Sequence, residues 1–186
     1  MYIRVLFFSL LALCVGFTAC KKLQKAFELT LTVPYDDAAF VSGLPGDPHV
    51  PPTGLKESLG LVKIPTSSKE VVEDNETALS LIREVKVSEL GVDMLLPLNQ
   101  DFSIMDSVWI YVSAAGVPEQ LAAYNFDMPD DTTRSITLTP TSADLLDVFI
   151  KDTMVVRIEG FFVKDVARES KIKFDMKFKV RADLLD

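Results

Sequence analysis

Residues 171–181, Lys-Ile-Lys-Phe-Asp-Met-Lys-Phe-Lys-Val-Arg, alternate strictly between charged and apolar side chains. Successive side chains of a β-strand point to opposite faces, so a period of two predicts a strand with one buried face. The apolar side chains that line the predicted core face are Ile172, Phe174, Met176, Phe178 and Val180. The class of fold then depends on how often such patterns recur along the chain.

Several other segments carry strand patterns of the same kind. Alternation or β-rich composition marks the ranges 27–33, 83–89, 121–126 and 135–139. Residues 106–113 are apolar or aromatic on both faces, which predicts a strand buried on both sides with Trp109 in the core. Residues 154–163 predict a long strand, and the short connection to 171–181 predicts that these two strands form a β-hairpin.

Two short segments have helical rather than strand patterns. One helix is predicted near 76–82, and another from about 145 to 151, after the capping sequence Thr141-Ser-Ala-Asp144. Six or seven strands with one or two short helices, and no alternation of strands with long helices, predict a mainly β fold. We expect an antiparallel β-sandwich of immunoglobulin-like shape, by analogy of strand spacing alone.

Residues 34–66 interrupt these patterns with six prolines and four glycines. Proline lacks a backbone donor and glycine adds conformational freedom, so this segment predicts a long loop with little regular structure at 43–54. The rest of the chain is short enough for one domain, which we place at residues 27–186.

The N-terminus has the organisation of an export signal. Arg4 supplies a positive charge, Val5–Phe17 is apolar but too short to span a bilayer, and Thr18 and Ala19 precede Cys20. Residues 1–20 resemble the lipobox of Gram-negative bacterial lipoprotein precursors. The resemblance implies that residues 1–19 are removed and that Cys20 is lipidated.

By the same resemblance, residues 20–26 form a short tether to a membrane, and no disulfide is expected in the mature chain. Lys21 follows Cys20 where an Asp would be a cue for inner-membrane retention, so the outer membrane is the expected location. We expect the domain on the periplasmic face, with surface exposure as the alternative.

Composition and motifs argue against several classes of function. The formal net charge of −8 and the pI near 4.7 disfavour nucleic-acid binding. His49 is the only histidine, and the sequence holds no Gly-x-Ser-x-Gly motif, phosphate-binding loop or dinucleotide fingerprint. We therefore expect a protein that is not an enzyme and needs no cofactor.

The predicted strand at 171–181 carries a row of cations on its outward face, in an otherwise acidic chain. The row comprises Lys171, Lys173, Lys177, Lys179 and Arg181. It suggests a stripe for anionic lipid headgroups or an anionic glycan. The alternatives are a solvated sheet face or lysines that protect an edge strand, with Glu159 as a cross-strand partner that neutralises part of the charge.

Two acidic clusters offer carboxylates of the kind that calcium prefers. They are Asp36-Asp37 and the group Asp127, Asp130 and Asp131. Aspartate also stabilises turns by accepting hydrogen bonds from its own backbone, and this explanation is the stronger one for both clusters.

The sequence supports three functional hypotheses. The first is a lipid-anchored, non-enzymatic protein of the cell envelope that binds or scaffolds an envelope protein, lipid or glycan at the outer membrane. The second is a structural or accessory subunit of a surface fibre, assembled by strand addition. The third is an envelope hydrolase, which requires a pocket with paired carboxylates or a perturbed His49.

Overall fold

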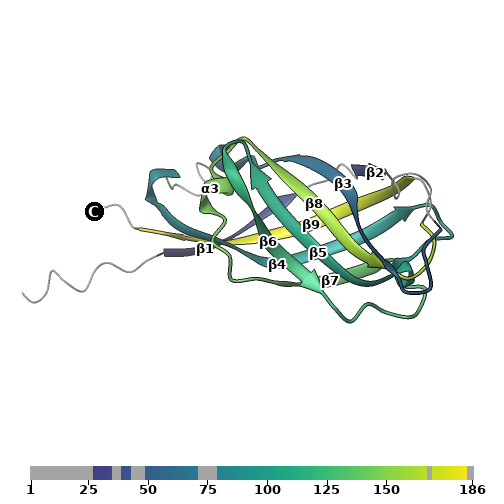
Figure 1. Cartoon of the computed structure of the whole chain (residues 1–186). Helices are drawn as coiled ribbons and strands as arrows, with labels where there is room; N and C mark the ends of the chain where they lie inside the picture. Colours follow the sequence, from purple (N-terminus) through teal and green to yellow (C-terminus); the bar gives the residue numbers. More distant parts are fainter. Residues whose placement is uncertain (1–26, 35–38, 43–48, 71–78, 167–168, 184–186) are drawn as a thin grey trace, which may run out of the picture.

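The computed structural model describes residues 27–34, 39–42, 49–70, 79–166 and 169–183 (Figure 1). Within them the strands are β1 (Phe27–Pro34), β2 (Ala39–Ser42), β3 (Leu55–Pro65), β4 (Ile82–Leu96), β5 (Met105–Ala114), β6 (Val117–Asn125), β7 (Ser135–Pro140), β8 (Thr153–Phe162) and β9 (Glu169–Ala182). The short helical elements are η2 (Leu79–Leu81), η3 (Phe102–Ile104) and α3 (Leu146–Phe149).

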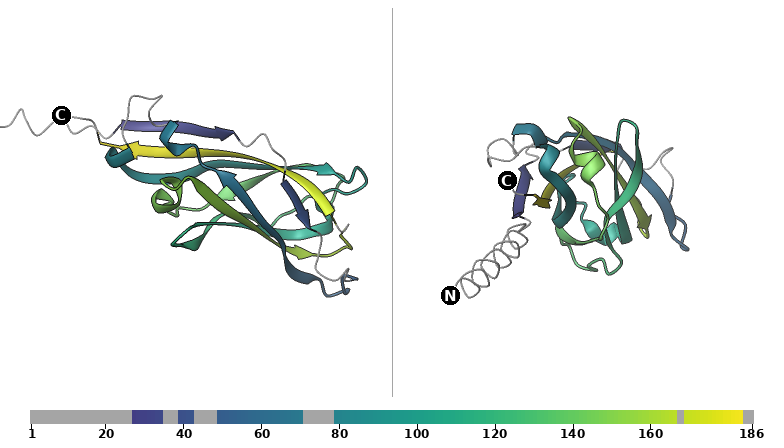
Figure 2. Two further views of the ribbon diagram at one scale, coloured as in Figure 1. Left: turned by 90° about the horizontal axis from the view of Figure 1, so that it is seen from above. Right: turned by 90° about the vertical axis from the view of Figure 1, so that its left-hand side faces the viewer.

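All strand pairings in the described residues are antiparallel, and they join into one sheet. The strand order is β1-β9-β4-β7-β6-β5-β8-β3, and β2 also pairs with β9. The sheet curls so that its two halves face each other across a single hydrophobic core (Figure 2). The inward side chains of β9 are buried in this core, as their alternation predicts.

The mainly β, antiparallel class is confirmed. The finer expectation of an immunoglobulin-like sandwich is not confirmed, because the sheet is continuous through β7. Leu138 of β7 is in register with Leu90 of β4, and Thr139 is in register with Tyr124 of β6. The strand β7 therefore joins the two halves, which in a sandwich would be separate sheets.

The predicted hairpin of residues 154–163 with 171–181 is wrong. Strand β8 pairs with β3 and β5, whereas β9 pairs with β1, β2 and β4. After β8 the backbone N–H groups of Val163 and Lys164 both donate to the carbonyl of Ile104, at 2.8 and 3.3 Å. These bonds hold the chain against the start of β5, and it then crosses to the other half of the sheet.

The prediction of a loop throughout 34–66 is also wrong, because β3 occupies Leu55–Pro65. Two glycines allow this strand to begin and to bend, and they do not prevent it from forming. Gly54 has a φ of +80° and its N–H closes a turn on Pro51, while Gly60 has a φ of +107° at a bulge in the pairing with β8. Both conformations favour glycine, and Pro65 ends the strand.

The aromatic side chains of β5 lie on its outer face, so the prediction that Trp109 belongs to the core is wrong. Val108, Ile110 and Val112 are buried, whereas Trp109 and Tyr111 are half-buried on the outer face. The ammonium of Lys56 lies 4.5 Å from the centroid of the Trp109 ring. A cation over its π face explains how a large aromatic side chain sits on the outside of the sheet.

The second predicted helix is confirmed in part as α3. Asp144 precedes it, and its Oδ1 atom accepts hydrogen bonds from the N–H groups of Leu146 at 3.1 Å and Val85 at 3.0 Å. One carboxylate thus orders the helix start and attaches it to β4. Of the first predicted helix, residues 76–78 lie outside the described residues, and Leu79–Leu81 forms η2.

Candidate functional site

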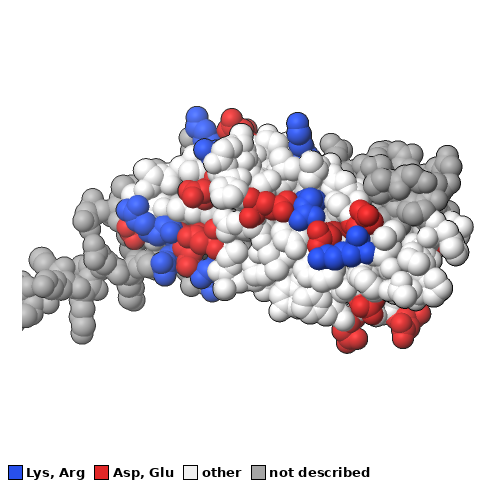
Figure 3. All heavy atoms as spheres, in the orientation of Figure 1, with Lys and Arg blue, Asp and Glu red and all other residues white. Residues whose placement is uncertain are grey.

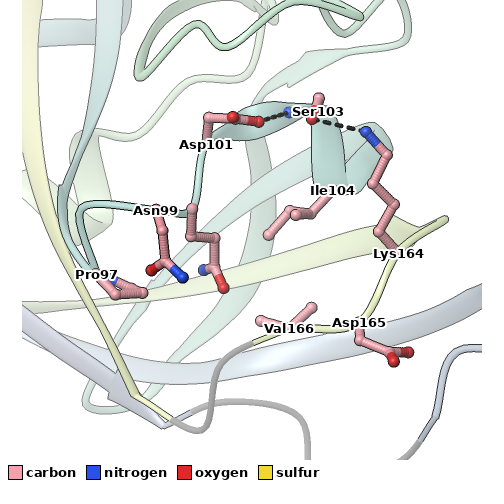
Figure 4. Close-up of a pocket in the computed structure, with 9 residues that line it drawn as sticks. Pro97, Asn99, Asp101, Ser103, Ile104, Lys164, Asp165 and Val166 are labelled. Atoms are coloured by element: carbon pink, nitrogen blue, oxygen red, sulfur yellow. Dashed lines mark hydrogen bonds between the residues drawn. The ribbon is translucent and has the colours of Figure 1, made fainter.

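A hollow of about 490 Å³ opens at the end of the sheet where β4 ends and β5 begins (Figure 4). Its lining residues come from the segments 97–104 and 164–166. Ile104 and Val166 point toward each other across it, while the carboxylate of Asp165 points away (Figure 4). Polar side chains of Asn99, Gln100, Asp101, Ser103 and Lys164 complete the lining.

Arg134 holds one wall of the hollow in place from outside it. Its guanidinium donates to three backbone carbonyls, those of Met94 at 2.7 and 3.0 Å, Pro97 at 3.2 Å and Leu98 at 2.6 Å. The neighbouring Thr133 carbonyl accepts from the N–H of Phe102 at 3.0 Å. Carbonyl groups in a turn have no partner in a neighbouring strand, so they need other hydrogen-bond donors. The planar guanidinium of Arg134 supplies these donors and fixes the whole turn.

The opposite side of the hollow is organised around Ser103. Its backbone N–H donates to Oδ1 of Asp101 at 2.9 Å, and its hydroxyl accepts from the ammonium of Lys164 at 2.9 Å. Hydrogen bonding from Ser103, by its side chain first and then by its backbone N–H, lowers the pKa of the Asp101 carboxyl below its usual value, with a smaller contribution from the charge of Lys164. Asp101 is therefore an anion and a hydrogen-bond acceptor at neutral pH.

Asp165 attaches the segment before β3 to the rim of the hollow. Its carboxylate accepts from the N–H of Val50 at 2.7 Å and lies 3.0 Å from Nδ1 of His49. These two bonds, that of Val50 first, lower the pKa of Asp165. The one histidine of the chain thus pairs with an aspartate on the surface, while the hydroxyl of Ser103 accepts from Lys164 and not from His49.

The hollow combines an ammonium group, a carboxylate and two amides with apolar side chains. A few convergent polar groups beside an apolar surface are typical of a binding site for a ligand with both donors and acceptors. Gln100 is buried, and its amide donates to the hydroxyl of Ser170 at 2.8 Å, so β9 also helps to fix the lining.

The predicted cationic row lies on the outward face of β9, but β9 is an interior strand, so edge protection is the wrong explanation for it. Strand β4 supplies acidic partners. Lys177 lies 2.8 Å from Glu89, which raises the pKa of that lysine, and Arg181 lies 3.7 Å from Glu84. Among the remaining members, Lys173 is in register with Asp93 and Lys179 with Lys86.

Lys171 of the row is in register with Leu96 of β4 and Phe40 of β2. Glu159 is not a partner of this row: it lies on β8 and pairs with Lys56 and Arg157. The row is thus partly neutralised by β4, and its role in binding anions stays a prediction.

The three aspartates of the predicted calcium site lie in the connection between β6 and β7. Asp131 accepts hydrogen bonds from the N–H and the hydroxyl of Thr133, and the N–H of Asp127 donates to Asn125 at 2.8 Å. In the part of the chain that the structure describes, no group of three or more acidic, histidine or cysteine side chains could hold a metal. The structure therefore does not bring Asp127, Asp130 and Asp131 together as metal ligands, and it favours the turn explanation.

Two of the predicted sites, Cys20 and the pair Asp36-Asp37, lie outside the described residues. No helix within the described ranges is both long and apolar enough to cross a membrane. No protein-family model matches the chain, and no curated protein is significantly similar to it in sequence.

Proposed function

We propose that this chain is a lipid-anchored, non-enzymatic binding protein of the bacterial cell envelope, which holds its ligand in the hollow beside Ser103. The resemblance of residues 1–20 to a lipobox supports the anchor, and the mixed polar and apolar lining supports binding. The ligand class that fits is a polar envelope component with an apolar surface, such as a glycan or a peptide segment. The expected location is the outer membrane, on its periplasmic face.

The observation that carries this proposal is that Phe27, the first described residue, and the hollow lie at opposite ends of the sheet. Phe27, the first residue of β1, is in register with Ala182 at the end of β9, whereas Leu96 beside the hollow is in register with Lys171 near its start. At roughly 3.3 Å per residue, Lys171 and Ala182 are about 36 Å apart along the strand. A chain anchored at Cys20 would therefore present the hollow away from the membrane.

The cationic row runs between these two ends, and we propose it as a secondary contact for anionic headgroups or glycans. We further propose that the two halves of the curled sheet act as the two layers of an immunoglobulin-like sandwich. The single shared core supports this view. Layers that cross at about −30° in an experimental structure would bear it out, and a closed barrel would contradict it.

The anchor is tested by membrane fractionation of cells that express a Cys20→Ala variant. We expect this variant to leave the membrane fraction and to lose incorporation of labelled palmitate. Cys14→Ala is the matched control, because Cys14 lies in the segment that cleavage removes. Unchanged fractionation of the Cys20→Ala chain would rule out the lipoprotein assignment.

Binding in the hollow is tested by NMR titration with soluble fragments of envelope glycan and peptide. We expect chemical-shift changes at the backbone amides of Asn99 and Ser103 and none at Ser80, which lies at the far end of the sheet. A Lys164→Met variant should weaken the response. Shifts confined to other surfaces would contradict the assignment of the hollow.

A second candidate function, a subunit of a surface fibre, is favoured by the position of β1. This strand is at one end of the strand order, and in the described residues it pairs only with β9. A strand donated by another subunit could pair with its other edge. Conversion of monomers to polymers after proteolytic trimming would support this function, and a chain that stays monomeric would count against it.

A further inference from the structure

Four of the charged side chains on the outward face of β6, β5, β8 and β3 form one continuous row, with members from β6, β8 and β3. Glu119 forms two bonds of 2.8 Å with the guanidinium of Arg157, which also lies 2.7 Å from Glu159. The second oxygen of Glu159 lies 2.7 Å from the ammonium of Lys56. The signs along the row are therefore negative, positive, negative and positive, and alternating charges cross this face of the molecule in Figure 3.

Aromatic rings beneath the row fix the positions of its two cations. The guanidinium of Arg157 lies 4.2 Å from the centroid of the Tyr111 ring, and the ammonium of Lys56 lies 4.5 Å from that of Trp109. The side chain of Arg157 is only 22% exposed and that of Glu159 only 18%. The two central members of the row are thus held in place, while Lys56 and Glu119 at its ends are more exposed, at 54% and 37%.

Two exposed apolar side chains flank the row on opposite sides. Leu61 of β3 is 66% exposed and is in register with Arg157. Phe126, which follows β6, is 58% exposed and stacks on Tyr124 with ring centroids 4.5 Å apart. The row leads from the β6 side to the β3 side, and the line from Leu61 to Phe126 crosses it.

We infer that this face binds a second copy of the same chain about a two-fold axis that lies in the interface and crosses the charged row. Such a rotation reverses the order of the row in the partner. Glu119 then faces Lys56 of the second copy, and Arg157 faces Glu159. Residues that lie near the axis meet the same residues of the second copy. Leu61 therefore meets Leu61, and Phe126 meets Phe126.

The chemistry of the face fits a second copy better than another macromolecule. The row has no net charge, so it has no long-range attraction for a polyanion or a polycation. An alternating row of even length is complementary to its own reversal, which is the requirement for a two-fold interface. Exposed aromatic side chains and arginine are also enriched at protein interfaces. The inference depends on neither the lipid anchor nor the hollow.

The decisive experiment reverses every charge of the row in one variant, Lys56→Glu, Glu119→Arg, Arg157→Glu and Glu159→Lys. Its row remains complementary to itself, so the variant should still dimerise. Against the native row, however, every charge faces its like, which strongly disfavours the mixed dimer. The experiment uses the full-length protein in mild detergent. We expect tagged native chain to retain untagged native chain but not the untagged reversed variant.

Sedimentation equilibrium measures the dissociation constant of the dimer, which should rise as salt is added. A native chain that stays monomeric up to roughly 1 mM would overturn the inference. Native and reversed chains that mix freely would overturn it as well, because the dimer would then use another surface.

Two further variants keep the test decisive if the reversed chain does not fold, which circular dichroism would reveal. Leu61→Glu alters an exposed side chain that faces its own copy, so the dimer dissociation constant should rise at least about tenfold. Ser80→Glu is the control, because Ser80 is exposed in η2, which leads into β4 on the other half of the sheet. Equal effects of these two substitutions would contradict the inferred interface.

Discussion

The guanidinium of Arg134 donates to the carbonyl oxygen of Leu98 at 2.6 Å, and the same group also serves the carbonyls of Met94 and Pro97. Leu98 itself is 81% exposed, so this turn has little apolar packing of its own to hold it. The shape of the hollow therefore depends on one side chain that does not line it.

Replacing Arg134 with lysine should loosen this wall, because an ammonium cannot reproduce the planar fork of donors. We expect the free energy of unfolding to fall by about 2 kcal/mol, the scale of hydrogen bonds from a charged donor. Urea unfolding measures the change. Arg83→Lys is the matched control, since Arg83 makes an exposed ion pair with Asp183 and its replacement should cost less than about 0.5 kcal/mol. Equal losses in the two variants would contradict the role given to Arg134.

The charged row on the outer face should give the protein an acid-sensitive component of stability. The hydrogen bond from Arg157 lowers the pKa of Glu119 below its ordinary value of 4.5. Burial alone raises the pKa of Glu159, but the bonds from Lys56 and Arg157 outweigh it and the pKa is lowered overall. Both groups thus bind protons less readily in the folded chain than in the unfolded chain.

It follows that this stabilisation is fully present above about pH 4.5 and is lost as the pH falls through the lowered folded values. Urea unfolding between pH 7 and pH 3 should show the loss in the native chain. A Glu119→Gln, Glu159→Gln variant should be less stable at pH 7 but lose less on acidification. Glu57→Gln, at an exposed position on β3, is the control. If the double variant loses as much stability as the native chain between pH 7 and pH 3, the acid sensitivity does not come from Glu119 and Glu159.

Two strand glycines should respond in opposite ways to alanine. A Cβ atom at Gly160 would lie 2.7 Å from the sulfur of Met105 and 2.9 Å from the ring of Phe162, both in the core. We expect Gly160→Ala to destabilise the fold by about 1–3 kcal/mol through overpacking. Gly91→Ala should be neutral or slightly stabilising, because its nearest contact would be an ordinary 3.7 Å. Thermal unfolding compares the two, and a smaller loss at Gly160 than at Gly91 would contradict the packing described for β8.

The patterns that the sequence could reveal were the local ones. The alternation of residues 171–181 identifies β9 because each inward side chain meets the same core. The pairing of β9 was not predictable in the same way, since its neighbours β1 and β4 are distant in sequence while β8 is near. Proximity in sequence favoured the hairpin that the structure lacks, and the bonds of Val163 and Lys164 to Ile104 leave no sequence signal.

The hollow cannot be predicted from the sequence, for a related reason. It depends on contacts such as His49 with Asp165, 116 residues apart, and Arg134 with Met94, 40 residues apart. Only Asp101-Phe-Ser103 offered a local signal, that of an aspartate capping a short turn. The sequence does not reveal the outer aromatic face, because Trp109 and Tyr111 are typical core residues. The cations that lie over their rings are known only from the structure.

The most direct test of the proposed function measures how far each end of the sheet lies from the membrane. A fluorophore is attached to a single introduced cysteine, either Ser80→Cys at the end near Phe27 or Asn99→Cys beside the hollow, in a Cys14→Ser chain with Cys20 retained. The lipidated proteins are placed in vesicles that carry a headgroup-bound quencher. We expect strong quenching at position 80 and little at position 99. Equal quenching at both positions, or stronger quenching at 99, would contradict a tethered protein that holds its hollow away from the membrane.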